Sequence, residues 1–239
     1  MQICENVWEE FIYIISHDIR AEFRALRELP VWIREDIAEA GYVLDADLSE
    51  NIDCLSSRAD RIDRMMEGLL KYTRVGTNES SGQSHLKAAL SNALDLVPNP
   101  NGFRITSTLP DRAVGIAEQD LVTLFEELIK NAIQHHDKPI GNIAINASLS
   151  GGSVYLDIID DGPGIPPEKV DMALQVLTSL SPAKKTHCSG MGLPICQKIA
   201  SRYAGSLSLQ PAQEPPGLHV RLELLELRSK APPVKSNTS

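Results

Sequence analysis

The segment Asp157-Ile-Ile-Asp-Asp-Gly-Pro-Gly-Ile165 joins an apolar run to a loop that contains two glycines. The run over 153–159 predicts a β-strand, and Asp160 follows at its end. A buried carboxylate at that position can accept a hydrogen bond from the exocyclic amine of adenine. Gly162 and Gly164 would let the backbone approach a flat ring closely. Taken alone, Asp-Gly-Pro-Gly is more typical of a plain turn, so this segment has to be interpreted together with the motifs around it.

A second glycine-rich turn, Ser189-Gly-Met-Gly-Leu193, directly precedes a helix predicted over 193–203. Backbone N–H groups of such a turn at a helix N-terminus bind phosphate. The phosphate-binding residues predicted here are Gly190, Met191, Gly192 and Leu193. Lys184, just upstream, is placed to meet triphosphate charge, although a solvated lid lysine is the alternative. The absence of a GxxxxGK[ST] sequence excludes a Walker-type loop.

A polar face is predicted on the helix over 117–136. Glu127, Asn131 and Gln134 are spaced by four and three residues, so they share one side of that helix. Carboxylate and amide oxygens are ligands that suit Mg²⁺. Lys130 is expected to point to the phosphates or to solvent. The alternative interpretation is a solvated polar face, which is the commoner explanation of any single cluster of this kind.

The first 76 residues predict two helices joined by a short turn. Apolar residues recur in steps of three and four from Trp8 to Ile37, and again from Leu48 to Leu69. Gly41 is a plausible stop signal for the first helix. An antiparallel hairpin cannot cover both apolar stripes by itself, so dimerisation into a four-helix bundle is expected.

His17 lies in the first of these helices, within Ser16-His-Asp-Ile-Arg20. It is rotated by about 200° from Ile15 and therefore faces away from the buried stripe. A solvent-facing neutral imidazole can act as a nucleophile, and Asp18 can take the departing proton or fix the tautomer. An ordinary surface histidine beside an ordinary surface aspartate explains this pentapeptide about equally well.

The domain organisation predicted from these patterns has four parts. Residues 1–76 form a helical hairpin that is expected to dimerise, 77–84 a linker, 85–226 a second domain, and 227–239 a disordered tail. Helices and strand pairs intermix in the second domain, which indicates an α+β fold: a two-layer α/β sandwich with a largely antiparallel sheet. One of its helices is expected over 170–177.

Composition narrows the class of protein. The chain has 239 residues, 42% of them hydrophobic, and a net charge of −9, which argues against duplex nucleic acid as a partner. The first residues lack the pattern of a signal peptide, and no apolar stretch is long enough to span a bilayer, so direct membrane insertion is not expected. The four scattered cysteines are expected to be reduced thiols. A cytoplasmic location fits these features.

Four motifs, in order, resemble those of the sensor histidine kinases of two-component systems. The segment 11–20 resembles their phosphoacceptor box, 127–136 their N box, 157–165 their DxGxG box, and 189–193 their second glycine box. The resemblance covers nearly all of the chain up to Leu225. It implies a helical hairpin followed by a GHKL-type ATP-binding domain, the fold shared by histidine kinases, gyrase B, Hsp90 and MutL.

The resemblance also implies roles for individual residues. His17 would be the phosphorylated residue and Asp18 its acid–base partner. Asn131 would hold Mg²⁺, and Glu127 would help to order the metal and water. Asp160 matches the aspartate of the DxGxG box.

The expected activity is therefore that of an ATP-dependent protein-histidine kinase, with ATP and Mg²⁺ as cofactors. The expected partners are a second copy of the chain and the receiver domain of a response regulator. No sensor module is recognisable, so a partner would supply it or it is missing from this chain. Two alternatives remain: a phosphotransfer adaptor with a degenerate ATP pocket, and a conformational ATPase of the gyrase or Hsp90 type.

Overall fold

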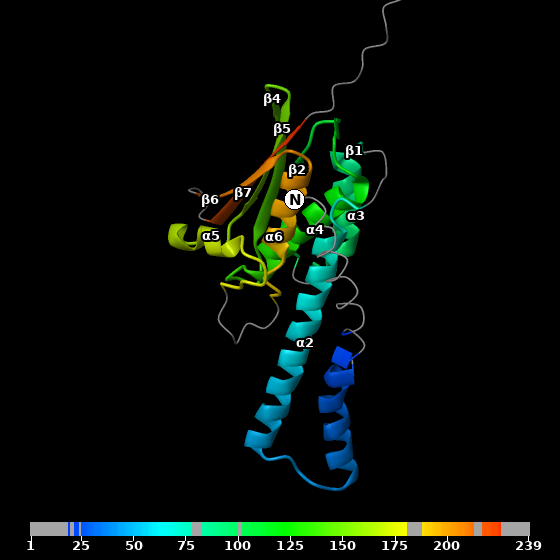
Figure 1. Cartoon of the computed structure of the whole chain (residues 1–239). Helices are drawn as coiled ribbons and strands as arrows, with labels where there is room; N and C mark the ends of the chain where they lie inside the picture. Colours follow the sequence, from blue (N-terminus) through cyan, green and yellow to red (C-terminus); the bar gives the residue numbers. More distant parts are fainter. Residues whose placement is uncertain are drawn as a thin grey trace, which may run out of the picture.

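The structure is a computed structural model and describes residues 19, 22–23, 25–77, 83–99, 102–180, 188–212 and 217–225. His17, Asp18 and Lys184 lie outside the described residues, as does the predicted tail over 227–239. Figure 1 shows a helical hairpin that leads into an α+β domain.

The hairpin consists of a helix over 25–39 and of α2, Ala46–Arg74, which lies beside it in the opposite direction (Figure 1). The first helix ends at Gly41, which has φ +76° and lets the N–H groups of residues 41 and 42 bond back to the last turn. Asp45 caps α2, because its carboxylate accepts from the N–H of Leu48 at 2.7 Å.

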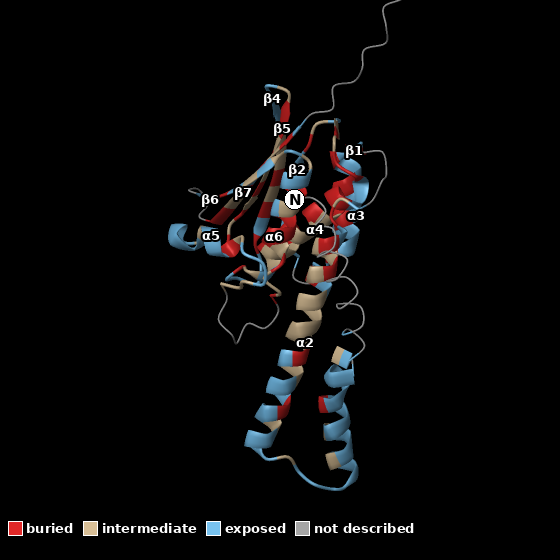
Figure 2. Ribbon diagram, viewed as in Figure 1, coloured by how far each residue is buried: buried red, intermediate tan, exposed pale blue. Residues whose placement is uncertain are grey.

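Two ion pairs tie the hairpin helices together. Arg27 lies 3.2 Å from Asp63, and Arg34 lies 2.6 Å from Asp53. Most of the hairpin is exposed (Figure 2), and several of its exposed side chains are large and apolar. Its exposed large residues include Leu26, Leu29, Trp32, Leu48 and Leu55.

The C-terminal domain is built on a five-stranded sheet of order β2-β4-β5-β7-β6. The strands are β2 Arg104–Thr108, β4 Asn142–Ser150, β5 Ser153–Asp160, β6 Ser206–Ala212 and β7 Gly217–Leu225. Only β2 and β4 are parallel, and the other neighbouring pairs are antiparallel. Two short strands, β1 Ser84–His85 and β3 Ala113–Val114, pair separately.

One face of the sheet is covered by α3 Leu86–Leu96, α4 Glu118–Gln134 and α6 Gly192–Arg202 (Figure 1). Alternation along β5 sends Val154, Leu156 and Ile158 to this face, where each is at most 2% exposed. From α4, five side chains at helical spacing meet them: Leu121, Leu124, Phe125, Leu128 and Ile129. The α+β class, with its two layers and mainly antiparallel sheet, is thereby confirmed.

The helix predicted over 170–177 is shorter in the structure. A 3₁₀ turn, Pro167–Lys169, leads into α5, Val170–Ala173. Leu177 has φ +62°, a conformation that an α-helix cannot contain, so the chain leaves the helix before that residue. The amphipathic pattern here reflected one buried residue, Ala173, rather than a full helical stripe.

The C-terminal half of α2 packs against the second domain and is half-buried there (Figure 2). Gly68 makes the close approach possible, because a Cβ at that position would lie 2.5 Å from the Cβ of Met191. Beyond α2, the N–H of Gly76 donates to the buried carboxylate of Asp120, which also accepts from the hydroxyl of Tyr203 at 2.6 Å. The junction between the two parts is thus held by specific contacts.

Candidate functional site: a nucleotide pocket

A cavity of about 390 Å³ opens between α4, the loop after β5, the start of α6 and the C-terminal half of α2. The predicted site residues that line it come from all three sequence motifs of the second domain: Glu127, Lys130, Asn131, Asp160, Gly164, Gly190, Gly192 and Leu193. Segments up to 66 positions apart in the sequence are therefore brought to one place.

Two predicted site residues do not line the cavity. Gly162 lies behind Asp160 and donates its N–H to that carboxylate at 3.0 Å. Met191 is fully buried beneath Gly68, so the second residue of the Gly-Met-Gly turn supports the turn from inside.

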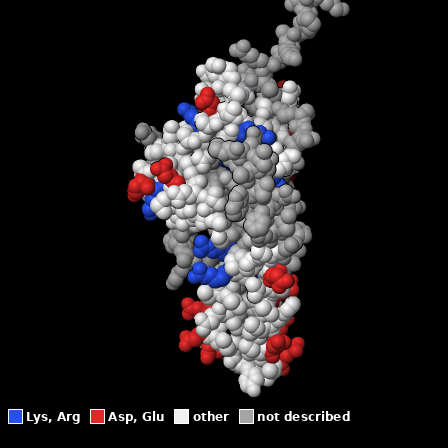
Figure 3. Space-filling view, in the orientation of Figure 1, with Lys and Arg blue, Asp and Glu red and all other residues white. Residues whose placement is uncertain are grey.

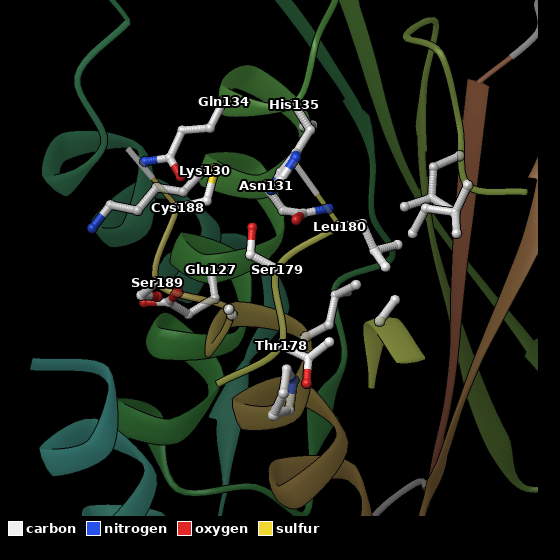
Figure 4. Close-up of a pocket in the computed structure, with 18 of the residues that line it drawn as sticks. Glu127, Lys130, Asn131, Gln134, His135, Thr178, Ser179, Leu180, Cys188 and Ser189 are labelled. Atoms are coloured by element: carbon white, nitrogen blue, oxygen red, sulfur yellow. The ribbon is translucent and has the colours of Figure 1, made fainter. Parts of the chain in front are cut away.

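The polar face of α4 points into this space. Figure 4 shows Glu127, Asn131 and Gln134 on successive turns of the helix, with Lys130 beside them. Lys130 also reaches back one turn and forms an ion pair with Glu126 at 2.5 Å. The spacing that predicted a shared face therefore does produce one.

Asp160 is the most deeply placed acid of the cavity, at 7% exposure. One carboxylate oxygen, Oδ1, accepts from the N–H groups of Gly162 and Leu218, at 3.0 and 3.2 Å. Burial raises the pKa of the Asp160 carboxyl above its usual value, against the opposing effect of these two N–H groups. With Oδ1 held in this way, the second oxygen is the one left to accept from an amine of a ligand.

Two glycines of the motifs are required by their surroundings. Gly164 has φ +69°, and a Cβ there would lie 2.7 Å from the carbonyl oxygen of Gly217. Gly190 has φ +72°, and a Cβ there would lie 2.6 Å from the carbonyl oxygen of Thr178. Both positions combine a left-handed backbone with a backbone neighbour that has no room to retreat, which only glycine accommodates.

Glu127 is held by a cation from α2. The Lys71 ammonium lies 2.7 Å from Glu127 and 2.9 Å from Glu126. Burial alone would lower the pKa of Lys71, but the two carboxylates outweigh burial and raise that pKa above its usual value. The pKa of Glu126 is below its usual value: burial alone would raise it, but hydrogen bonds from Lys130 and Lys71 outweigh burial. In this arrangement the Glu127 carboxylate is paired with a side chain of the hairpin.

The side chains that would meet Mg²⁺ are oxygen donors one helical turn apart. Asn131 and Glu127 both line the cavity, and both carry the hard oxygen atoms that Mg²⁺ prefers. Among the described residues no cluster of three or more His, Cys, Asp or Glu could hold a metal by itself.

Basic side chains surround the cavity entrance. Figure 3 shows Lys and Arg gathered where the hairpin meets the second domain, whereas the lower hairpin is flanked by acidic side chains. Among the described residues, Lys and Arg side chains that line the cavity are Arg64, Lys71, Lys130 and Lys169. A polyanionic ligand such as a triphosphate would find complementary charge here.

The comparisons with known proteins agree with this geometry. Residues 116–228 match the family described as histidine kinase-, DNA gyrase B-, and HSP90-like ATPase. Cyanobacterial phytochrome A of Nostoc sp. is 28% identical over 206 residues, which cover 83% of this chain and 26% of that protein. Sensor histidine kinase GlrK of Escherichia coli is 26% identical over 220 residues, which cover 86% of this chain and 44% of that protein.

The chain is similar to the sensor histidine kinases over most of its length. Its second domain carries the match to the ATPase family, and the predicted family resemblance is confirmed. A crystal structure of full-length ShkA in complex with AMPPNP has the same fold, with a TM-score of 0.60 at 17% identity, over 92% of this chain and 47% of that one. The chain spans less than half the length of the two sequence relatives named above.

The sequence motifs did not reveal what α2 contributes. Arg64, Gly68 and Lys71 line the cavity from outside the ATPase domain. Lys71 lies in the last turns of a helix whose repeating pattern reports only the hairpin seam, so no local signal points to a partner 56 positions away. In the part of the chain that the structure describes, no helix has the length and apolarity needed to cross a membrane.

Proposed function

We propose that this chain is an ATP-dependent protein-histidine kinase that phosphorylates its own His17 and passes the phosphoryl group to an aspartate of a response regulator. The observation that carries the proposal is the convergence of Asn131, Asp160 and the Gly190–Gly192 turn on one cavity. The similarity to sensor histidine kinases supports the same activity.

Different residues of the cavity would bind different parts of the nucleotide. The free oxygen of Asp160 accepts from the adenine amine, and the backbone N–H groups at the start of α6 face the phosphates. Asn131 and Glu127 would hold Mg²⁺, which neutralises charge on the β- and γ-phosphates. Lys71, 2.7 Å from one carboxylate oxygen of Glu127, would hold this side chain in place.

The transfer itself is a displacement at phosphorus. A ring nitrogen of His17 attacks the γ-phosphorus, the bond from that phosphorus to the bridging β–γ oxygen breaks, and ADP leaves with the electron pair. Asp18 takes the proton that the imidazole loses. Catalysis comes chiefly from positioning and from charge neutralisation. The phosphorus–nitrogen bond then breaks as a carboxylate of the regulator attacks in turn.

The partners follow from the same proposal. The exposed apolar flank of the hairpin, with Leu26, Trp32 and Leu55, would pair with a second copy in a four-helix bundle. The receiver domain would dock on the hairpin near His17. We also propose that this part of the protein lies in the cytoplasm, where its ATP substrate is available.

The proposal is tested by labelling the purified chain with [γ-³²P]ATP. Wild-type protein is expected to acquire a label that is lost in acid and kept in alkali, as a phosphohistidine is. His17→Gln removes the acceptor and Asn131→Ala removes the metal ligand, so neither single variant should be labelled. Mixing the two variants restores labelling of the Asn131→Ala subunit if transfer runs between subunits of a dimer. Alkali-stable labelling of His17→Gln contradicts the assignment of the acceptor.

A phosphotransfer adaptor would give a different result in a nucleotide titration. A kinase binds ATP in the cavity, and Asp160→Asn weakens that binding, because the amide presents a donor as well as an acceptor to the adenine amine. An adaptor with a degenerate pocket shows no saturable ATP binding in either protein.

A further inference from the structure

His136 occupies a sealed position just beyond the C-terminal end of α4, which ends at Gln134. Its side chain is 1% exposed, and the ring of Phe103 meets it edge-on at a centroid distance of 5.2 Å. No part of this imidazole reaches the cavity, yet it lies between two of the walls that form it. A buried imidazole at such a place needs partners for both ring nitrogens.

Both nitrogens are provided for. Nε2 lies 3.0 Å from Oδ1 of Asp161, a carboxylate that offers no proton, so Nε2 carries the hydrogen and donates. Nδ1 lies 3.0 Å from the N–H and 3.1 Å from the carbonyl oxygen of Lys138. The neutral ring accepts from that N–H, and the protonated ring donates to that carbonyl oxygen. The imidazole is therefore held in place in either state.

Asp161 is the central acceptor of a hydrogen-bond network that joins three segments of the chain. Besides His136 from the end of α4, the backbone N–H and the side-chain amide of Asn142 donate to it, each at 2.7 Å. Burial opposes ionisation, but these hydrogen bonds and the nearby imidazole together outweigh it and lower the pKa of Asp161 to about 2. The carboxylate is thus a permanent acceptor that ties the end of α4 and the start of β4 to the loop after β5.

This hydrogen-bond network lies next to the residues that position Asp160. Gly162, whose N–H holds Oδ1 of Asp160, is packed so tightly that a Cβ on it would lie 3.3 Å from Cδ2 of His136. On the other side of the ring, a Cβ on Gly141 would lie 2.5 Å from Nε2 of His136. A small movement of the imidazole would therefore displace the Gly162 N–H and turn the Asp160 carboxylate.

We propose that His136 is a positioning residue which, through its hydrogen bond to Asp161, fixes the Asp160–Gly162 loop and so sets the preference of the site for adenine over guanine nucleotides. The inference rests on the proposed function, because it assumes that the cavity takes a nucleotide. Adenine presents an exocyclic amine to Asp160, whereas guanine presents a carbonyl oxygen at the same ring position. A carboxylate held in one orientation accepts from the first and repels the second.

Two variants separate positioning from simple packing. The amide of Gln reaches the position of Nε2, so His136→Gln keeps the hydrogen bond to Asp161. The shorter Asn reaches only the position of Nδ1, so His136→Asn keeps the contact with Lys138 and loses the one with Asp161. Both replacements remove the buried ring, and both are expected to lower the midpoint of thermal unfolding by similar amounts.

The experiment measures binding of a fluorescent ATP analogue to the full chain, and its displacement by ATP and by GTP. We expect wild type and His136→Gln to prefer ATP to a similar degree. His136→Asn is expected to bind ATP about ten-fold more weakly and to lose most of its discrimination against GTP, the effect of one hydrogen bond to a charged group. Equal affinities and equal ATP preference in the two variants overturn the inference.

The outcomes distinguish this inference from the proposed function. If wild-type protein binds no adenine nucleotide, the proposed function fails and this inference fails with it. If wild type binds ATP but the variants do not differ, only the role of His136 is wrong. Should His136→Asn not fold, Asp161→Ala removes the same hydrogen bond from a side chain that is 20% exposed, and it is expected to show the same loss of ATP preference.

Discussion

Replacing Gly164 by alanine should damage the nucleotide pocket far more than the same replacement at Gly151. Both glycines have a left-handed backbone, with φ +69° and +63°. They differ in their surroundings: a Cβ on Gly164 meets the carbonyl oxygen of Gly217 at 2.7 Å, whereas a Cβ on Gly151 meets no atom within 4 Å. The pair therefore isolates the steric contact from the backbone strain.

The magnitudes follow from these two terms. An alanine in the left-handed region costs about 1 kcal/mol at either position. At Gly164 the neighbouring strand must also retreat by several tenths of an ångström, or the loop must shift, which adds about 2 kcal/mol. We therefore expect a free energy of unfolding lowered by about 1 kcal/mol in Gly151→Ala and by about 3 kcal/mol in Gly164→Ala. Nucleotide affinity is expected to change only in the latter, by about ten-fold.

The affinity should fall because Gly217 precedes Leu218, whose N–H holds Oδ1 of Asp160 at 3.2 Å. The assay is urea unfolding followed by circular dichroism, combined with titration of a fluorescent ATP analogue in native buffer. Similar destabilisation by the two variants would mean that the contact with Gly217 relaxes freely. Unchanged ATP affinity in Gly164→Ala would mean that β7 does not transmit the strain to Asp160, and the reasoning would then be wrong.

Three further perturbations test other contacts. Lys71→Met removes a half-exposed cation from two carboxylates and should weaken the packing of α2 on the ATPase domain by about 1 kcal/mol. The expected result is roughly five-fold faster hydrogen exchange over 64–74. Unchanged exchange would mean that the ion pairs do not contribute to stability. Tyr203→Phe removes a hydrogen-bond donor from the buried carboxylate of Asp120 and should lower the free energy of unfolding by about 1–2 kcal/mol, measured by urea unfolding. An unchanged free energy of unfolding would mean that water replaces the hydroxyl. The folded-state pKa of Asp161 is about 2, below its usual 3.8, so its contribution to stability, up to about 2 kcal/mol, is complete above pH 4 and is lost as the pH falls towards 2. Wild type and Asp161→Ala should therefore differ less in free energy of unfolding at pH 3 than at pH 6. A constant difference would contradict the assigned hydrogen bonds.

The parts of this protein that local patterns specify were predictable. Apolar periodicity and turn residues locate the hairpin, its stop at Gly41, and the helices and strands of the ATPase domain. The helix expected over 170–177 is wrong in length, because α5 spans only Val170–Ala173 and Leu177 has a left-handed backbone. Two predicted binding residues, Gly162 and Met191, lie outside the lining of the cavity. The motif residues of the cavity were also predictable, because Glu127, Asn131, Asp160 and the glycines carry their chemistry in a few adjacent positions.

The sequence by itself therefore determined the resemblance to the sensor histidine kinases, the order of the elements and the residues of each motif, since these depend on contacts within a few positions. Only the tertiary structure decided which side chains control those residues. Lys71 meets Glu127 from 56 positions away, and His136 meets Asp161 from 25 positions away. Such pairs form because the sheet register and the packing of α2 bring distant backbone segments together, and no periodicity or spacing in the chain encodes which polar groups then face each other.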